Sequence, residues 1–145
     1  MKTISVVVPA FNSEDTLPRL LQSLLDPSLE FLKEIIVVND GSTDNTESIA
    51  QKYASESSKV KVLSQVNSGA GVARNSALKL TSGDYVFFCD ADDVVDSIKL
   101  CEIHKRISFS DPDILVFTYG LFNQDSNKPV PMPARDWRCY SSLYK

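Results

Sequence analysis

The sequence predicts an α/β fold built on a mostly parallel sheet. Two patterns alternate along the chain: short runs of β-branched and other apolar residues, typical of strands buried on both faces, and segments with apolar residues at helical spacing. This alternation is typical of parallel strands joined by right-handed helical crossovers. With 145 residues, 43% of them hydrophobic, the chain has the size of one domain and can bury a core.

The first elements follow directly from these patterns. Residues 4–8 (ISVVV) predict a buried strand, which Pro9 is expected to end. Residues 12–15 are polar and typical of a helix N-terminus, and the leucines of residues 17–25 recur at helical spacing. Residues 35–38 (IIVV) predict the second buried strand.

The later elements continue the same alternation. A polar loop over residues 39–44 separates the second strand from the next helix. The chain then predicts a helix ending near residue 55, a strand over 60–63, a helix over 69–80, a strand over 85–89, a helix over 94–107 and a strand over 114–117.

Three polar or turn-forming segments follow predicted strands. They are residues 9–11, residues 39–40 and residues 90–93. In open parallel sheets, ligands bind at the carboxyl ends of strands, where the strand order reverses. We therefore expect the three segments to converge on one crevice.

Residues 90–93 (DADD) place three carboxylates directly after a predicted buried strand. Like charges this close repel one another, so the cluster suggests a positive partner, and a divalent cation with oxygen ligands is a natural candidate. A cation held by one or two carboxylates keeps positions open for substrate phosphates. The alternative is a helix N-cap, with Asp92 or Asp93 capping a segment that starts near Val94.

Two further residues have a functional and a structural interpretation. Asp40 could accept hydrogen bonds from a nucleoside, or it could belong to an ordinary Asp-Gly turn before a helix capped by Thr43 or Asp44. Arg74 lies early in a helix that follows a glycine-containing loop, where it would suit a phosphate. Its alternative is a solvent-facing arginine.

Four sequence blocks favour the functional interpretation of these residues, because the blocks occur together and in order. They are residues 5–12 (SVVVPAFN), 37–44 (VVNDGSTD), 67–75 (NSGAGVARN) and 90–93 (DADD). In these blocks and their separations, the chain resembles the family 2 glycosyltransferases over about residues 1–119. The resemblance implies the GT-A fold, a Rossmann-like three-layer αβα sandwich.

The resemblance also implies a nucleotide-sugar site and roles within it. Its residues would be Pro9, Ala10, Phe11, Asp40, Asn67, Arg74, Asp90, Ala91 and Asp92. Phe11 would border the base, in place of the family's usual Tyr, and Asp40 would bind the uracil. Asp92, and in one interpretation also Asp90, would ligate Mn²⁺ or Mg²⁺. Asp93 would cap the helix or face the donor sugar.

The activity implied is metal-dependent transfer of a sugar, with inversion, from a UDP-sugar to a saccharide or lipid-linked acceptor. The family's general base lies beyond the Asp-x-Asp pair and is not evident here. We therefore expect a truncated domain: a donor half over residues 1–120 and a tail over 121–145 leading into a missing or shortened acceptor region. Alternatives are a non-catalytic nucleotide-sugar-binding module and a phosphohydrolase with an aspartate nucleophile.

Composition narrows the partners and the compartment. A net charge of −4 and a pI near 4.9 argue against a general nucleic-acid binder. Three cysteines without metal-ligand spacing, and no visible signal peptide or spanning segment, favour a cytoplasmic protein, with association at the inner membrane face as an alternative.

The tail over residues 121–145 has a different composition from the rest of the chain. Pro129, Pro131 and Pro133 favour extended backbone. After them, Trp137, Tyr140 and Tyr144 would share one helical face. That face would pack on the protein's own core or mediate a homodimer.

Overall fold

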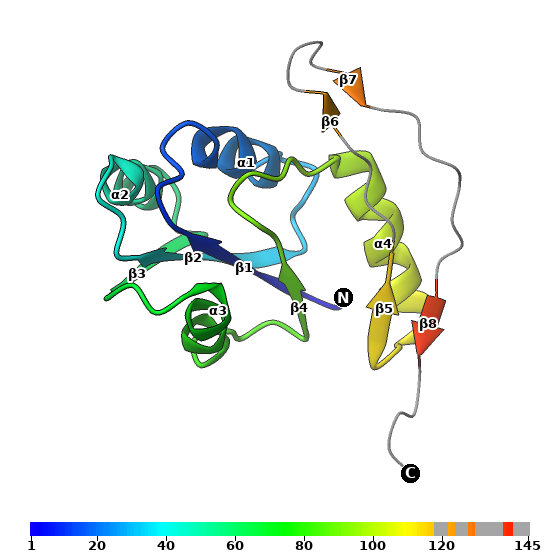
Figure 1. The fold of residues 1–145 in the computed structure, drawn as a ribbon. Helices are drawn as coiled ribbons and strands as arrows, with labels where there is room; N and C mark the ends of the chain where they lie inside the picture. The colour runs from blue at the N-terminus through cyan, green and yellow to red at the C-terminus, as the bar shows by residue number, and fades with distance from the viewer. Residues whose placement is uncertain (118–121, 124–127, 130–137, 141–145) are drawn as a thin grey trace. The chain divides into compact units, whose positions relative to one another are not determined.

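The computed structural model describes residues 1–117, 122–123, 128–129 and 138–140, and the chain divides into two compact units, residues 1–105 and 106–145 (Figure 1). The first unit contains a parallel sheet with strand order β3-β2-β1-β4. Its strands are β1 (Ile4–Ala10), β2 (Leu32–Asp40), β3 (Val60–Gln65) and β4 (Tyr85–Phe88). The division at residue 105 is structural, and the functional boundary expected near residue 120 stays a prediction.

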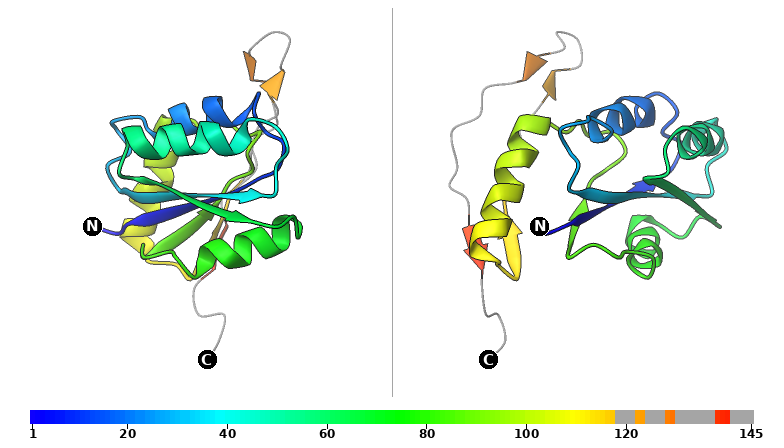
Figure 2. Two further views of the ribbon diagram at one scale, coloured as in Figure 1. Left: turned by 90° about the vertical axis from the view of Figure 1, so that its left-hand side faces the viewer. Right: turned by 180° about the vertical axis from the view of Figure 1, so that it is seen from behind.

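Helices cover both faces of this sheet, as the predicted three-layer αβα fold requires. Figures 1 and 2 show α1 (Leu17–Leu24) and α2 (Thr46–Glu56) on one face and α3 (Ala70–Leu78) on the other. The core on the α3 side packs two small residues of that helix against aliphatic residues of β1 and β2: Ala73 and Ala77 against Val7, Ile36 and Val38. Among the described residues, no helix is long and apolar enough to span a bilayer.

The strand β1 continues through Pro9, so the expectation that Pro9 ends it is wrong. Pro9 pairs in register with Val38 of β2. On the other side, the Val7 carbonyl accepts a hydrogen bond from the Cys89 amide, and alternate residues of a strand point the same way. The Pro9 nitrogen therefore faces the β4 side, where pairing has ended at Phe88, and its missing N–H costs no ladder bond.

The helix α4 (Ser97–Ser110) begins later than residue 94. Its cap is Asp96, whose carboxylate accepts a hydrogen bond from the Lys99 amide at 3.1 Å. The alternative that Asp92 or Asp93 caps this helix is therefore wrong. The acidic segment keeps a turn conformation before the helix, in which the Asp93 amide donates to the Asp90 carbonyl.

The second unit contains short antiparallel pairs. β5 (Ile114–Val116) pairs with β8 (Arg138–Tyr140), and β6 (Phe122–Asn123) pairs with β7 (Lys128–Pro129). Tyr140 thus lies on a strand, and its predicted place on a helical face is wrong. Trp137 and Tyr144 lie outside the described residues, and the homodimer stays a prediction.

A buried carboxylate holds the amino end of the sheet together. Glu34 of β2 is 1% exposed and accepts hydrogen bonds from Ser5 Oγ at 2.7 Å, from Ser82 N at 2.6 Å and from Ser82 Oγ at 2.9 Å. It also pairs with the Lys61 ammonium. Burial raises the pKa of Glu34, but these bonds outweigh it and lower the pKa to about 2. We call these four residues the Glu34 cluster.

Candidate functional site

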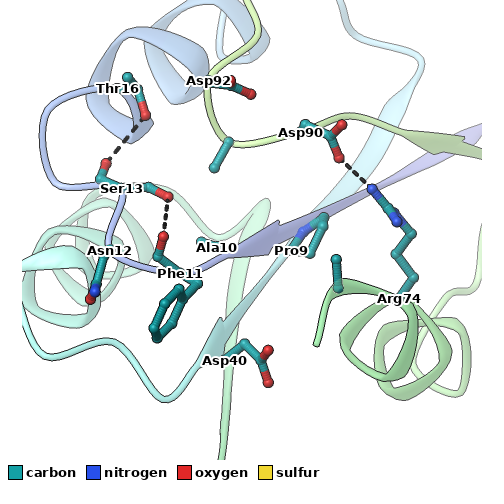
Figure 3. Close-up of a pocket in the computed structure, with 12 residues that line it drawn as sticks. Pro9, Ala10, Phe11, Asn12, Ser13, Thr16, Asp40, Arg74, Asp90 and Asp92 are labelled. Carbon is teal, nitrogen blue, oxygen red and sulfur yellow. Dashed lines mark hydrogen bonds and ion pairs between the residues drawn. The ribbon is translucent and has the colours of Figure 1, made fainter. Parts of the chain in front are cut away.

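A cavity of about 500 Å³ opens at the carboxyl ends of β1, β2 and β4 (Figure 3). The strand order reverses between β1 and β4, so the cavity lies where ligands bind in open parallel sheets. Its volume falls within the range of small-molecule sites. It is lined by Pro9, Ala10, Phe11, Asn12, Ser13, Thr16, Asp40, Ala70, Arg74, Asp90, Ala91 and Asp92.

One end of the cavity combines an aromatic ring with a buried carboxylate. Phe11 is 48% exposed, and Asp40 is 3% exposed. Asp40 Oδ1 accepts from Gln65 Nε2 at 2.8 Å and Ser68 N at 2.9 Å, while Oδ2 accepts from Gly69 N at 2.8 Å. A carboxylate has about four acceptor positions, so Oδ2 retains one for a ligand.

The same bonds keep Asp40 ionised. Burial by itself would raise the pKa of Asp40, but the hydrogen bonds from Gln65, Ser68 and Gly69 outweigh it and hold the pKa below its ordinary value. The ionised carboxylate is a strong hydrogen-bond acceptor. It is suited to a ligand N–H or O–H group rather than to a ligand acceptor.

Two loops that border this end are tied together by side-chain bonds. The backbone N–H of Asn12 donates to Ser42 Oγ at 3.0 Å, and Asn12 Oδ1 accepts a hydrogen bond from the backbone N–H of Thr43 at 2.8 Å. Glu14 Oε2 accepts hydrogen bonds from the backbone N–H of Asn45 at 2.9 Å and from Asn45 Nδ2 at 2.7 Å. Asn12 adopts a φ of 47°, which asparagine tolerates better than most residues. The loops thus hold the cavity wall in place before any ligand arrives.

The other end of the cavity is acidic. The Arg74 guanidinium reaches from α3 and pairs with the Asp90 carboxylate, as Figure 3 shows. Asp93 Oδ2 accepts a hydrogen bond from the Asp90 amide at 3.0 Å, so this carboxylate closes the turn. The Asp92 side chain lines the cavity and is exposed.

These residues fit a divalent cation that arrives with a phosphate ligand. Among the described residues, no group of three or more His, Cys, Asp or Glu side chains forms a cation cage. Asp92, with Asp90 beside it, supplies hard oxygen donors that face the cavity. Mg²⁺ and similar cations are commonly held by one or two carboxylates together with substrate phosphates. The donor set therefore suits a cation shared between protein and ligand.

The structure brings most of the predicted site residues together. Pro9, Ala10, Phe11, Asp40, Arg74, Asp90, Ala91 and Asp92 all line the cavity. Asn67 and Asp93 are not among its lining residues: the Asn67 backbone packs on Gly41, and Asp93 closes the acidic turn.

Four lining residues were not predicted from the sequence: Asn12, Ser13, Thr16 and Ala70. Their polar or small side chains are also typical of helix N-termini, and that explanation hides their place in the cavity. The family-like blocks include two of them, Asn12 in residues 5–12 and Ala70 in residues 67–75, without marking either as a site residue.

Gly41→Ala is expected to lower the free energy of unfolding by about 1 kcal/mol or more. Gly41 has a φ of 71°, and a Cβ there would lie 2.7 Å from the Asn67 amide nitrogen. Gly71→Ala is the matched control, because a Cβ there meets nothing within 4 Å and the residue lies in α3. Thermal unfolding of both variants checks this, and equal stability would contradict it.

The fold and cavity define the class of protein: a Rossmann-like α/β protein with a cavity at the switch point of its sheet. The model of the family described as "Glycosyl transferase family 2" matches residues 5–144. The chain belongs to this family.

Relatives and solved structures agree. The uncharacterized glycosyltransferase YibD of Escherichia coli is 45% identical over 92 residues, 63% of this chain and 26% of that protein. The cholesterol galactosyltransferase of Borreliella burgdorferi is 34% identical over 119 residues, 82% of this chain and 33% of that protein. The crystal structure of Staphylococcus aureus TarS 1–349 with UDP has a TM-score of 0.74 and 34% identity, covering 90% of this chain and 38% of that chain.

The comparisons confirm the GT-A type of α/β fold that the sequence predicts. They also show that this chain spans less than half the length of each of these three proteins.

Proposed function

We propose that this chain is the donor-binding part of a glycosyltransferase that uses a nucleotide-diphosphate sugar, with UDP as the nucleotide. The observation that carries the proposal is the cavity itself. It joins an aromatic ring and a hydrogen-bonding carboxylate at one end to an arginine and two carboxylates at the other (Figure 3). The UDP complex of the related TarS supports the uridine nucleotide.

In this proposal, the base lies at the end formed by Phe11 and Asp40. The Phe11 ring offers a face for stacking, and the remaining acceptor position on Asp40 Oδ2 suits a base N–H group. Uracil presents such a group at N3, whereas cytosine presents an acceptor at that position. The cavity is therefore expected to prefer UDP to CDP.

The diphosphate lies toward Arg74, Asp90 and Asp92. Mn²⁺ or Mg²⁺ would be held by Asp92, with Asp90 beside it, and would neutralise charge that develops on the leaving diphosphate. Arg74 carries a permanent charge and pairs with Asp90. When the donor enters, the guanidinium can turn from this carboxylate toward the diphosphate or keep Asp90 oriented toward the ribose.

Transfer with inversion requires a base for the acceptor hydroxyl. The three acids that line the cavity have other roles, because Asp40 is hydrogen-bonded at the base end and Asp90 and Asp92 serve the diphosphate end. We therefore place the general base outside the cavity lining. A saccharide or lipid-linked acceptor and a cytoplasmic location, with association at the inner membrane face as the alternative, are parts of the same proposal.

Calorimetric titration of the 145-residue chain with UDP, with and without Mn²⁺, tests the proposal. We expect binding that Mn²⁺ strengthens by about tenfold or more, since Asp92 and the diphosphate would both supply oxygen ligands to the cation. CDP serves as the matched control for the base. If the folded chain binds no UDP, or binds CDP equally well, the proposed donor site is wrong.

The alternative of a binding module without turnover has its own test. Incubation of the chain with UDP-sugars and simple saccharide acceptors would reveal transfer if the chain is sufficient for it. Donor binding without any product, over a panel of acceptors, would favour the binding module for this length of chain.

A further inference from the structure

Two polar residues of α1 bind the backbone between β4 and α4, one within the acidic turn of residues 90–93 and one just after it. Arg19 Nη2 donates to the Asp92 carbonyl oxygen at 3.4 Å, and Ser23 Oγ accepts a hydrogen bond from the Val95 amide at 3.1 Å. The two residues are four positions apart and therefore lie on the same side of the helix. We call Arg19 and Ser23 the α1 clamp.

The Ser23 hydroxyl is oriented for this task. It donates its proton to the Leu20 carbonyl at 2.7 Å, which leaves its lone pairs available to the Val95 amide. Both clamp residues are half-buried, although the leucine pattern of α1 assigns them to the side of the helix away from the core.

The turn is thus held from both faces of the sheet. Arg74 comes from α3 on one face and pairs with the Asp90 carboxylate, whereas Arg19 comes from α1 on the opposite face and binds the Asp92 carbonyl (Figure 1). Both guanidinium groups are permanently charged, and they approach a segment that carries three carboxylates. Each arginine therefore reduces repulsion within the turn while it fixes a different residue.

We propose that Arg19 is a positioning residue for Asp92. It does not line the cavity, and it acts through the Asp92 backbone. By fixing the carbonyl, the clamp sets the direction in which the Asp92 carboxylate leaves the backbone, toward the cavity. The consequence for ligand binding rests on the proposed function, whereas the consequence for the turn does not.

Hydrogen exchange of the ligand-free chain tests the clamp without any ligand. Ser23→Ala removes the acceptor of the Val95 amide and is expected to speed exchange of that amide about five- to tenfold, the factor that matches loss of one net hydrogen bond. Arg19→Met is expected to speed the same exchange indirectly, because it frees the Asp92 carbonyl and loosens the turn. Lys33→Met is the matched control, because Lys33 Nζ donates to the Ser82 carbonyl at the amino end of the sheet. Val95 exchange in Arg19→Met that equals the rate in Lys33→Met would overturn the proposal.

The titration with UDP and Mn²⁺ tests the effect on Asp92. Arg19→Met is expected to weaken Mn²⁺-supported UDP binding about tenfold, the usual cost of removing an outer partner of a metal ligand, and to change metal-free UDP binding less than about twofold. Arg19→Lys should recover most of the loss, since it keeps the charge and an N–H donor. Equal losses with and without Mn²⁺ would overturn the positioning role.

The two experiments separate this proposal from the proposed function. If Arg19 acted only by repelling the cation, its removal would tighten Mn²⁺-supported binding, and that result would also overturn positioning. If the unmodified chain shows no Mn²⁺-supported binding, the proposed function fails. The exchange rates of Val95 then still decide whether Arg19 positions the turn.

Discussion

Asp92→Asn is expected to abolish the strengthening of UDP binding by Mn²⁺. The carboxylate lines the cavity, and Asp90, the other acid at this end, is paired with Arg74. An amide oxygen carries no net charge and is a weaker ligand for a hard cation than a carboxylate. The variant should bind UDP with the same affinity with and without Mn²⁺. Its affinity in the presence of Mn²⁺ would therefore be about tenfold or more below that of the unmodified chain.

The control for Asp92→Asn is Asp26→Asn. Asp26 follows α1 on the way to the amino end of β2, away from the cavity, and its replacement by Asn makes the same change in net charge. Calorimetry with and without Mn²⁺ measures both variants beside the unmodified chain. Mn²⁺-supported binding that survives in Asp92→Asn would contradict the assignment of Asp92 as the cation ligand.

Glu34→Gln is expected to lower the free energy of unfolding by about 3 kcal/mol, as removal of one partner from a buried charged network typically does. The amide would place an NH₂ group among donors that now share a carboxylate, including Ser82 N and the Lys61 ammonium. For a domain of this size, that loss corresponds to a fall in Tm of about 10 °C.

The same carboxylate predicts a pH dependence of stability. The pKa of Glu34 falls from its ordinary value of 4.5 to about 2 in the folded chain. A lowered folded pKa stabilises the protein above pH 4.5, and the contribution of about 3 kcal/mol disappears as pH falls from 4.5 through 2. Glu34→Gln should lack this part of the acid sensitivity.

Denaturant unfolding at a series of pH values measures both effects. Glu30→Gln is the control, because Glu30 is exposed and the substitution removes the same charge from the neighbouring segment. If the stability gap between the unmodified chain and Glu34→Gln stays constant from pH 6 to pH 2.5, the Glu34 cluster does not act through ionisation of Glu34.

The fold could be predicted because buried parallel strands and amphipathic helices leave strong local patterns. The points at which strands end and helices begin were less predictable. Pro9 stays in β1 because the neighbouring strand has already ended, and α4 starts at Ser97 because Asp96 supplies the cap. The first outcome depends on a neighbouring strand that the local pattern does not contain, whereas the second depends on which of three nearby acids, Asp92, Asp93 or Asp96, caps the helix.

The candidate site, too, could be predicted only in part from the sequence. Family-like blocks identified Asp40, Arg74 and the acidic turn, but they did not show that Asp40 already accepts three hydrogen bonds. The α1 clamp left no signal, because Arg19 and its partner Asp92 are 73 positions apart. Asn67 belongs to a family-like block, yet its backbone supports Gly41 instead of lining the cavity.

A single strand, β2, carries Glu34 near its amino end and Asp40 at its carboxyl end. At about 3.3 Å per residue, the two carboxylates lie roughly 20 Å apart, beyond the distance at which substitutions usually influence one another. Robustness and ligand preference can therefore be altered separately in this protein. A variant selected for heat tolerance through the amino end of the sheet should keep its choice of nucleotide, and a variant with a redesigned base end should inherit the parent's melting behaviour.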